Sequence, residues 1–237
     1  MKVLMRSDNP EFLVITPLKP GDKISKETKK SVKRNNFPFD WVSFEGPNNI
    51  PTNTTHALQR YIEEYGKPRM FIKIDNDIDM DRYLLDTLCG EMVRSNLSSV
   101  GRYGYTYCPF SYILENGKKI SFGEEFNVDK LLKQNYISSN SMIDMDMFDM
   151  VGGLVCDCKY ERLLDWALWL RCLNFGFIGK YVPNKGFVTP LNNNNVSARG
   201  VDDYKEKAGR IQRDFVKPIL DTIQNNKMFS DSHQNIT

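Results

Sequence analysis

Alternating aspartates form the segment of this sequence that is best suited to chemistry. Residues 75–81 read Asp-Asn-Asp-Ile-Asp-Met-Asp and follow an apolar run at 70–74 that has the character of a buried strand. Side chains at every second position leave the same side of an extended backbone. Clustered carboxylates repel one another unless a cation or a proton neutralises them, and hard oxygen ligands suit Mg²⁺ or Mn²⁺. Such ions complete their shells with water and substrate phosphates, so the segment predicts a site for a divalent ion and a nucleoside diphosphate.

Two other interpretations of this segment remain open. Its spacing imitates an EF-hand calcium loop, but Met80 stands where that loop needs glycine and Asp86 where it needs glutamate. The alternative is a solvated acidic turn that caps the following helix, with Asp79 or Asp81 as the cap. For Asp81 by itself, capping is the favoured role.

Length and composition predict an ordinary globular protein. The chain has 237 residues, 41% hydrophobic and 26% charged, with a formal charge of +2. This is enough for one well-packed domain, and it gives no electrostatic preference for nucleic acid or anionic membranes. The first eight residues contain no apolar stretch long enough for the central region of a signal peptide. No run of about 18 apolar residues occurs that could cross a membrane, and the five cysteines are odd in number. We therefore expect a cytoplasmic protein with reduced thiols.

The order of the elements predicts an α/β fold. Apolar runs at 12–15, 41–44 and 70–74 alternate with helical patterns at 24–35, 54–65 and 84–93, which is the rhythm of crossover units on a parallel sheet. The second half is less regular. It predicts strands at 103–113, 119–122 and 177–182, helices at 145–151, 160–174 and 201–226, an irregular loop at 189–200 and a disordered tail at 227–237.

Four short motifs lie in a fixed order along residues 12–183. They are Val-Ile-Thr-Pro at 14–17, Asp-Asn-Asp at 75–77, Asn-Tyr-Ile-Ser-Ser at 135–139 followed by Gly152-Gly153, and Asp-Trp-Ala-Leu-Trp-Leu-Arg at 165–171. In this order they resemble the family 2 glycosyltransferases of the GT-A fold. The resemblance implies one Rossmann-like α/β domain over 1–226, with a central, mostly parallel mixed sheet flanked by helices. Residues 12–100 would be its nucleotide-sugar-binding half, 101–200 its acceptor half and 201–226 a C-terminal helix.

The resemblance also implies a donor site for a nucleotide-diphospho-sugar, with a UDP-sugar favoured. Asp77 would hold Mn²⁺ or Mg²⁺ together with the diphosphate. Asp75 is the second metal candidate, although hydrogen bonds to the ribose or its hydroxyls suit it better. The other donor-binding candidates are Thr16, Pro17, Glu45, Asn53 and Asn76. Glu45 would stand in for an aspartate that the family often carries after its second strand.

On the acceptor side, the resemblance implies an inverting transfer in which Asp165 is the general base. A positioned general base contributes about 10²–10⁴-fold in rate. Helix capping is the alternative role for Asp165, because the first turn of a helix favours an acid. Gly153 and Trp166 are the acceptor-binding candidates; a helix stop and a core position are their respective alternatives. The family's usual second acid is Leu164 here, and residues 189–197 contain no histidine to complete a metal site.

Two other functions compete with glycosyl transfer to a glycan or another hydroxyl-bearing acceptor. A sugar-phosphate nucleotidyltransferase can share this sheet, but residues 18–22 match its glycine-rich basic loop poorly. A non-catalytic nucleotide- or sugar-binding relative would account for Leu164 and the missing histidine. The lysine-rich run at 23–34 is explained most simply as a solvated helix face, so a nucleic-acid acceptor is the less favoured partner.

Overall fold

The computed structural model describes residues 1–97, 102–154, 156–160, 163–191 and 201–223. Its central element is a seven-stranded mixed sheet with the order β1-β3-β2-β4-β9-β6-β10. The strands are β1 (Lys2–Met5), β2 (Phe12–Leu18), β3 (Phe39–Glu45), β4 (Met70–Lys73), β6 (Tyr103–Tyr107), β9 (Met142–Asp144) and β10 (Ile178–Tyr181). Strand β2 pairs in parallel with β3 and β4, and β6 pairs in parallel with β10. The pairs β1–β3, β4–β9 and β6–β9 are antiparallel.

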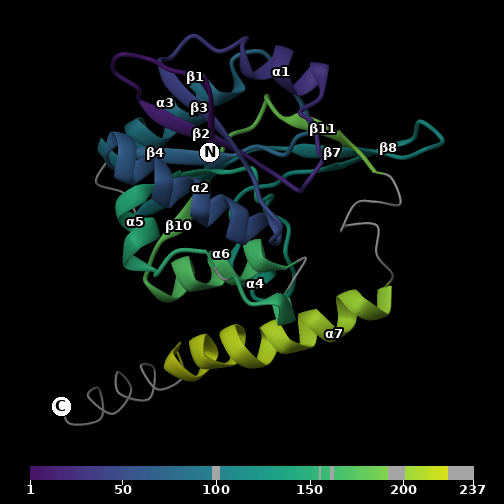
Figure 1. Ribbon diagram of the computed structural model, residues 1–237. Coiled ribbons are helices and arrows are strands. Elements are labelled where there is room, and N and C mark those ends of the chain that lie inside the picture. The colour runs from purple at the N-terminus through teal and green to yellow at the C-terminus, as the bar shows by residue number, and fades with distance from the viewer. Residues whose placement is uncertain (98–101, 155, 161–162, 192–200, 224–237) are drawn as a thin grey trace.

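A smaller four-stranded sheet lies beside the large one, at the right-hand side of Figure 1. Its order is β5-β11-β7-β8, from β5 (Asp79–Met80), β7 (Phe110–Ile113), β8 (Lys119–Phe122) and β11 (Phe187–Pro190). Phe187 and Val188 of β11 pair with Met80 and Asp79 of β5. The acidic segment after β4 is thereby fixed to a strand that lies more than a hundred positions further along the chain.

Helices cover the large sheet and continue beyond it (Figure 1). They are α1 (Lys26–Val32), α2 (Ile50–Tyr65), α3 (Leu84–Leu97), α4 (Val128–Leu131), α5 (Met145–Met150), α6 (Leu164–Asn174) and α7 (Val201–Ile211). A 3₁₀ turn at Cys158–Tyr160 precedes α6, and a π-helical turn at Gln212–Val216 continues α7. Helix α7 runs below α4 and α6 in Figure 1, where Nε2 of Gln212 donates to the carbonyl of Leu132 at 2.8 Å. None of the described helices is long and apolar enough to cross a membrane.

Strand β2 lies at the centre of the core, and all seven of its residues are buried. A continuous apolar run is expected for a strand that is covered on both faces, because neither row of side chains meets water. Each fully buried Val, Leu or Ile side chain contributes about 1.5–3 kcal/mol to stability. Trp41, Trp166 and Trp169 are among the largest fully buried side chains. The core therefore extends from the first strands to helix α6 without interruption.

The predicted fold class is confirmed, and the deviations are local. The three early strands and their helices are present, but parallel pairing covers only three of the six strand pairs in the large sheet. The sequence did not predict the short strands β1, β5, β9 and β11. Thr189 and Pro190, which the sequence assigns to the irregular loop, belong to β11, whose pairing with β5 and β7 makes it a strand. The helix predicted over 160–174 begins at Leu164, after the 3₁₀ turn. The predicted tail at 227–237 lies outside the described residues, as do 192–200 of the predicted loop and 224–226 of the last helix.

Candidate donor and catalytic site

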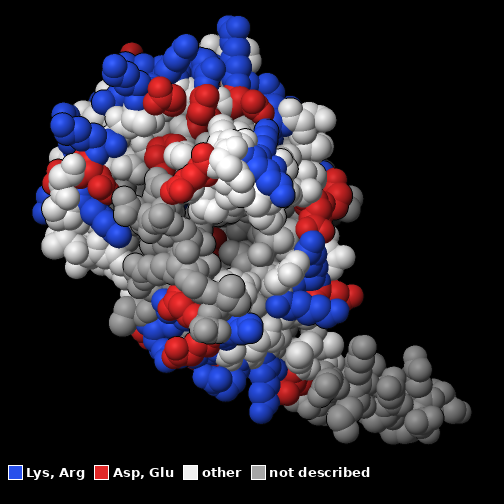
Figure 2. All heavy atoms as spheres, turned by 90° about the vertical axis from the view of Figure 1, so that its right-hand side faces the viewer, with Lys and Arg blue, Asp and Glu red and all other residues white. Residues whose placement is uncertain are grey.

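The acidic segment lies where three parallel strands end at one edge of the large sheet. Strands β2, β3 and β4 run in the same direction, and residues 75–81 follow β4 directly. The carboxyl ends of such strands are the usual place for a ligand in an open α/β sheet. Figure 2 shows the molecule from the right-hand side of Figure 1, and this face is hollowed near its centre, with acidic atoms at the base of the hollow.

Asp75 is held on both of its carboxylate oxygens. The ammonium of Lys73 lies 2.7 Å from Oδ1 of Asp75, and Nδ2 of Asn140 donates to Oδ2 at 3.0 Å. The backbone N–H of Asp75 in turn donates to Oδ1 of Asn140 at 3.0 Å. Partial burial opposes ionisation of this carboxyl, but the charge of Lys73 and the hydrogen bonds from Lys73 and Asn140 outweigh it. Together they lower the pKa of Asp75, so Asp75 is a carboxylate with a fixed orientation.

Asp77 has fewer partners and a different electrostatic environment. Its Oδ1 accepts a hydrogen bond of 3.2 Å from the hydroxyl of Thr189 on β11. Burial and the negative charge of Asp75 raise the pKa of Asp77, and the Thr189 hydrogen bond offsets this only in part. Negative charge at this position is therefore under-compensated, which is the condition under which a bound cation is stabilised.

The ligand set for a metal is small. Among the described residues there is no group of three or more His, Cys, Asp or Glu side chains that could hold an ion. Asp77 offers hard oxygen, the chemistry that Mg²⁺ and Mn²⁺ prefer, but these ions take about six oxygen ligands. The residues present fit an ion that Asp77 holds at one side while phosphate oxygens and water complete the shell.

Asp165 lies in the first turn of α6 and is linked electrostatically to the acidic segment. Its Oδ1 accepts from the backbone N–H of Trp166 at 2.9 Å. Burial raises its pKa to about 6, although a hydrogen bond from Asn135, the Trp166 amide and the positive charge of Lys73 act in the opposite direction. This bond comes from the next residue and is not an N-cap bond, because the N-cap of α6 is Leu163, which makes no side-chain cap hydrogen bond. Lys73 acts on both Asp75 and Asp165, so the structure brings the predicted base into range of the donor-side acids.

Two of the predicted donor-binding side chains are used by the fold itself. Thr16 is fully buried, and its Oγ1 accepts from Nε1 of Trp41 at 3.0 Å. Asn53 is also fully buried, and its Nδ2 donates to the carbonyls of Leu18, Gly46 and Asn48 at 2.9–3.1 Å. Asn53 therefore ties the end of β2 to the loop after β3. A nucleotide could meet Thr16 only through its backbone. The side-chain amide nitrogen of Asn53 is already engaged by the three carbonyls and is not available to a nucleotide.

The other predicted donor-side residues line the edge of the sheet. Pro17 is buried in β2, next to Thr16. Glu45 is exposed at the end of β3, and its Oε1 accepts from the backbone N–H of Gly21 at 3.0 Å. Asn76 is joined to the loop before α1, because its carbonyl accepts from the N–H of Ser25 at 2.8 Å. Asn76 is half-buried, and its Nδ2 also donates to the carbonyl of Lys23 at 3.3 Å.

The structure gives structural roles to Trp166 and Gly153, the two residues predicted to bind the acceptor. Trp166 is fully buried and its Nε1 donates to the carbonyl of Leu131 at 2.7 Å, so it packs in the core and presents no surface to an acceptor. This corrects the acceptor-lining prediction for Trp166. Gly152 and Gly153 have φ angles of 78° and 74° and end helix α5, which favours the helix-stop interpretation. Arg171 of α6 donates to the carbonyls of Val151 and Gly153.

Asp81 does not cap helix α3, which corrects the role predicted for it. Its carboxylate accepts from the backbone N–H of Gly186 at 2.7 Å. The first turn of α3 is instead capped from outside by Asn35, whose Oδ1 accepts from the N–H of Leu85 at 2.9 Å. Asp79, the other capping candidate, forms an ion pair of 2.7 Å with Arg34. Both acids therefore brace the segment that carries Asp75 and Asp77.

Sequence reasoning missed three polar residues of the site: Lys73, Asn140 and Thr189. Lys73 had a usable signal, since it ends an apolar strand two positions before Asp75, and alternate residues of a strand share a side. Asn140 precedes the three-residue strand β9 and Thr189 lies in the four-residue strand β11, and both strands are too short to show a periodic pattern. Only the pairing of β11 with β5 and of β9 with β4 brings them to the acids.

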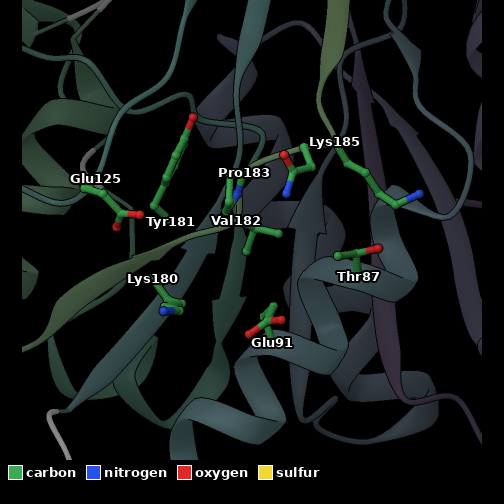
Figure 3. Close-up of a pocket in the computed structure, with 9 residues that line it drawn as sticks. Thr87, Glu91, Glu125, Lys180, Tyr181, Val182, Pro183 and Lys185 are labelled. Atoms are coloured by element: carbon green, nitrogen blue, oxygen red, sulfur yellow. The ribbon is translucent and has the colours of Figure 1, made fainter.

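A separate cavity of about 430 Å³ lies between α3 and the turn after β10. Figure 3 shows its lining, which includes Thr87 and Glu91 from α3 and Lys180, Tyr181 and Lys185 from the other wall. Lys185 donates to the carbonyl of Arg82 at 2.6 Å, and Glu91 pairs with Arg94. None of the predicted site residues lines this cavity. The acidic segment is therefore the candidate site that the sequence and the structure share.

Comparison with known proteins gives a likeness in structure alone. No protein-family model matches the chain, and no curated protein sequence does. The crystal structure of S. aureus TarS matches with a TM-score of 0.52 at 11% identity, over 83% of this chain and 38% of that one. The structures of TarS residues 1–349 with UDP-GlcNAc and with UDP match with TM-scores of 0.54 and 0.51, each at 12% identity over 83% of this chain. The chain spans less than two thirds of the length of each of these structures. Its fold is that of a GT-A-type glycosyltransferase.

Proposed function

We propose that this protein transfers a sugar from a nucleotide-diphospho-sugar, a UDP-sugar in the first instance, to a hydroxyl group of a glycan or another acceptor. The observation that carries the proposal is the pair Asp75 and Asp77 at the carboxyl edge of β4, one held by Lys73 and Asn140 and the other by Thr189. This arrangement occurs in a fold whose solved neighbours were crystallised with UDP-GlcNAc and UDP.

Each residue of the donor side has a distinct task in this proposal. Asp75, with its fixed carboxylate, accepts hydrogen bonds from donor hydroxyls. Asp77 holds Mn²⁺ or Mg²⁺, which when bound neutralises charge on the departing diphosphate. The exposed carboxylate of Glu45 and the half-buried amide of Asn76 bind the nucleoside end of the donor at the edge of the sheet. The buried Asn53 holds the end of β2 and the loop after β3 together at that edge through its three hydrogen bonds.

Asp165 is the general base of the proposed reaction. Its carboxylate removes the proton of the acceptor hydroxyl while the acceptor oxygen attacks the anomeric carbon of the sugar. The bond from that carbon to the diphosphate oxygen breaks, its electron pair stays on the diphosphate, and the configuration inverts. A base with a pKa of about 6 is mostly ionised at neutral pH and still accepts a proton readily.

Release of nucleoside diphosphate from a panel of nucleotide sugars, with and without Mn²⁺, tests this function. We expect Mn²⁺-dependent release with at least one UDP-sugar, and loss of that release in Asp165→Asn while donor binding persists. Release of pyrophosphate from a nucleoside triphosphate and a sugar phosphate would instead indicate a nucleotidyltransferase. Binding of a nucleotide sugar without turnover on any acceptor would indicate a non-catalytic relative.

A further inference from the structure

Lys73 introduces a fixed positive charge into the site that the proposed function assigns to the donor. Its ammonium lies 2.7 Å from Oδ1 of Asp75, and only 12% of its side chain is exposed. The two side chains leave the same side of the chain because they are two positions apart along an extended backbone. The first acid of the segment thus has a cationic partner that is built into the protein.

Asn140 completes the hold on Asp75. Its Nδ2 donates to Oδ2, the oxygen that Lys73 does not contact, and its own Oδ1 accepts from the backbone N–H of Asp75. A carboxylate has about four acceptor positions, so hydroxyl donors can still reach it. A divalent ion on Oδ1 would lie within about 5 Å of the ammonium, given metal–oxygen distances of about 2.1 Å, and would be repelled by it.

Asp77 alone is a weak site for an ion. No cluster of three or more metal-binding side chains occurs within the part of the chain that the structure describes. One carboxylate and water hold Mg²⁺ or Mn²⁺ loosely, because these ions take about six oxygens and bind through several anionic ones. A diphosphate adds both oxygen ligands and negative charge at the same place, and its charge also attracts Lys73.

We propose that Lys73 makes metal binding conditional on the donor, so that the ion enters the site with the diphosphate and leaves with it. This inference rests on the proposed function and adds an order to its binding steps. Lys73 opposes entry of the ion into the donor-free site, where it would otherwise be shared by Asp75 and Asp77. Once the diphosphate is present, its negative charge outweighs the ammonium and the ion is retained.

Titration with Mn²⁺ alone, followed by the electron paramagnetic resonance signal of free Mn²⁺, tests the inference without turnover. We expect weak binding by the wild-type protein, binding at least about tenfold tighter by Lys73→Met, and wild-type behaviour in Lys73→Arg, which keeps the charge. Addition of UDP should tighten Mn²⁺ binding strongly in the wild type and much less in Lys73→Met. Lys159→Met is the matched control, since Lys159 pairs with Asp157 at the same two-residue spacing on an exposed surface.

Because Lys73→Met also loses the ion pair with Asp75 and could be less stable for that reason, thermal unfolding with and without Mn²⁺ is the second measurement. Mn²⁺ alone, at a concentration that saturates only the variant, should raise the Tm of Lys73→Met by several degrees and that of the wild type much less, because the variant binds the ion more tightly without donor. Equal Mn²⁺ affinity in the two proteins, with both still binding a UDP-sugar in the presence of Mn²⁺, overturns this inference and leaves the proposed function standing. Failure of the wild type to bind any nucleotide sugar overturns both.

Discussion

The hydroxyl of Thr189 donates a hydrogen bond of 3.2 Å to Oδ1 of Asp77, across 112 positions of sequence. Strand β11, which carries Thr189, pairs with β5, the part of the acidic segment formed by Asp79 and Met80. The small sheet thereby fixes the carboxylate that the proposed function gives to the metal. No histidine stands near this position in the sequence, and a threonine hydroxyl is the polar group that reaches the acid.

Removal of that hydroxyl should weaken donor binding and leave the fold intact. Thr189→Val keeps the shape of the side chain but takes away a hydrogen bond worth about 0.5–1.5 kcal/mol. We expect a UDP-sugar in the presence of Mn²⁺ to bind about three- to tenfold more weakly by isothermal titration calorimetry. Thr189→Ser, which retains the hydroxyl, should bind nearly as the wild type does. Equal loss in both variants would mean that packing, and not the hydrogen bond, is responsible.

The rate of transfer should depend on the ionisation of Asp165. Burial raises the pKa of this carboxyl to about 6, and only the ionised form can accept a proton. We therefore expect kcat/KM to rise with pH up to about pH 6 and to level off above pH 7. The hydrogen bond from Asn135 lowers this pKa, so Asn135→Ala should move the rising limb to higher pH. A profile with no limb between pH 5 and 7 in the wild type would exclude Asp165 as the base.

The same carboxyl should cost stability at neutral pH. Because the pKa of Asp165 is higher in the folded than in the unfolded protein, protonation of this carboxyl stabilises the folded state. That stabilisation is fully present below about pH 4 and is lost as pH rises through about 6. Asp165→Asn removes the ionisation and should raise the free energy of unfolding by about 1–2 kcal/mol at pH 7.5. Asp129→Asn changes an exposed acid in the first turn of α4 and serves as the control. A stability loss in Asp165→Asn would contradict the assignment of a half-buried acid whose ionisation the fold disfavours.

Substitution of Asn53 should lower the stability of the fold more than it changes donor affinity directly. Its amide nitrogen donates to three carbonyls, and its Oδ1 is buried with no hydrogen-bond partner. Asn53→Ala leaves those carbonyls without their donor and should lower the free energy of unfolding by about 2–4 kcal/mol in urea. Asn53→Asp should cost more, since a carboxylate would then face three carbonyl oxygens. Unchanged stability with a large loss of donor affinity would instead favour a direct contact with the nucleotide.

The acidic site could be predicted from the sequence because its signal is local. An apolar strand that ends in alternating carboxylates is visible in a dozen residues, and the parallel rhythm of the first hundred residues places that end at a ligand-binding edge. The partners of the acids could not be predicted. Asn140 lies just before the three-residue strand β9 and Thr189 lies in the four-residue strand β11, and their positions depend on pairing between distant strands.

The sequence also could not predict which side chains of the buried helix α6 face a ligand. Seven of the eleven residues of α6 are buried, so no polar face shows which side meets a ligand. Trp166 was assigned to an acceptor surface on motif order, whereas it is fully buried with its Nε1 bonded to the carbonyl of Leu131. Strand β9 was missed because three residues are too few for a period to emerge, although it separates β4 from β6 in the sheet.

Calorimetric titration of the wild-type protein and of Asp77→Asn with UDP-sugars in the presence of Mn²⁺ tests the central claim most directly. The account predicts that at least one UDP-sugar binds the wild type with Mn²⁺ and much more weakly with EDTA, and that Asp77→Asn abolishes this difference. A wild-type protein that binds no nucleotide sugar with any divalent ion would contradict it. So would an Asp77→Asn variant that retains the full effect of Mn²⁺.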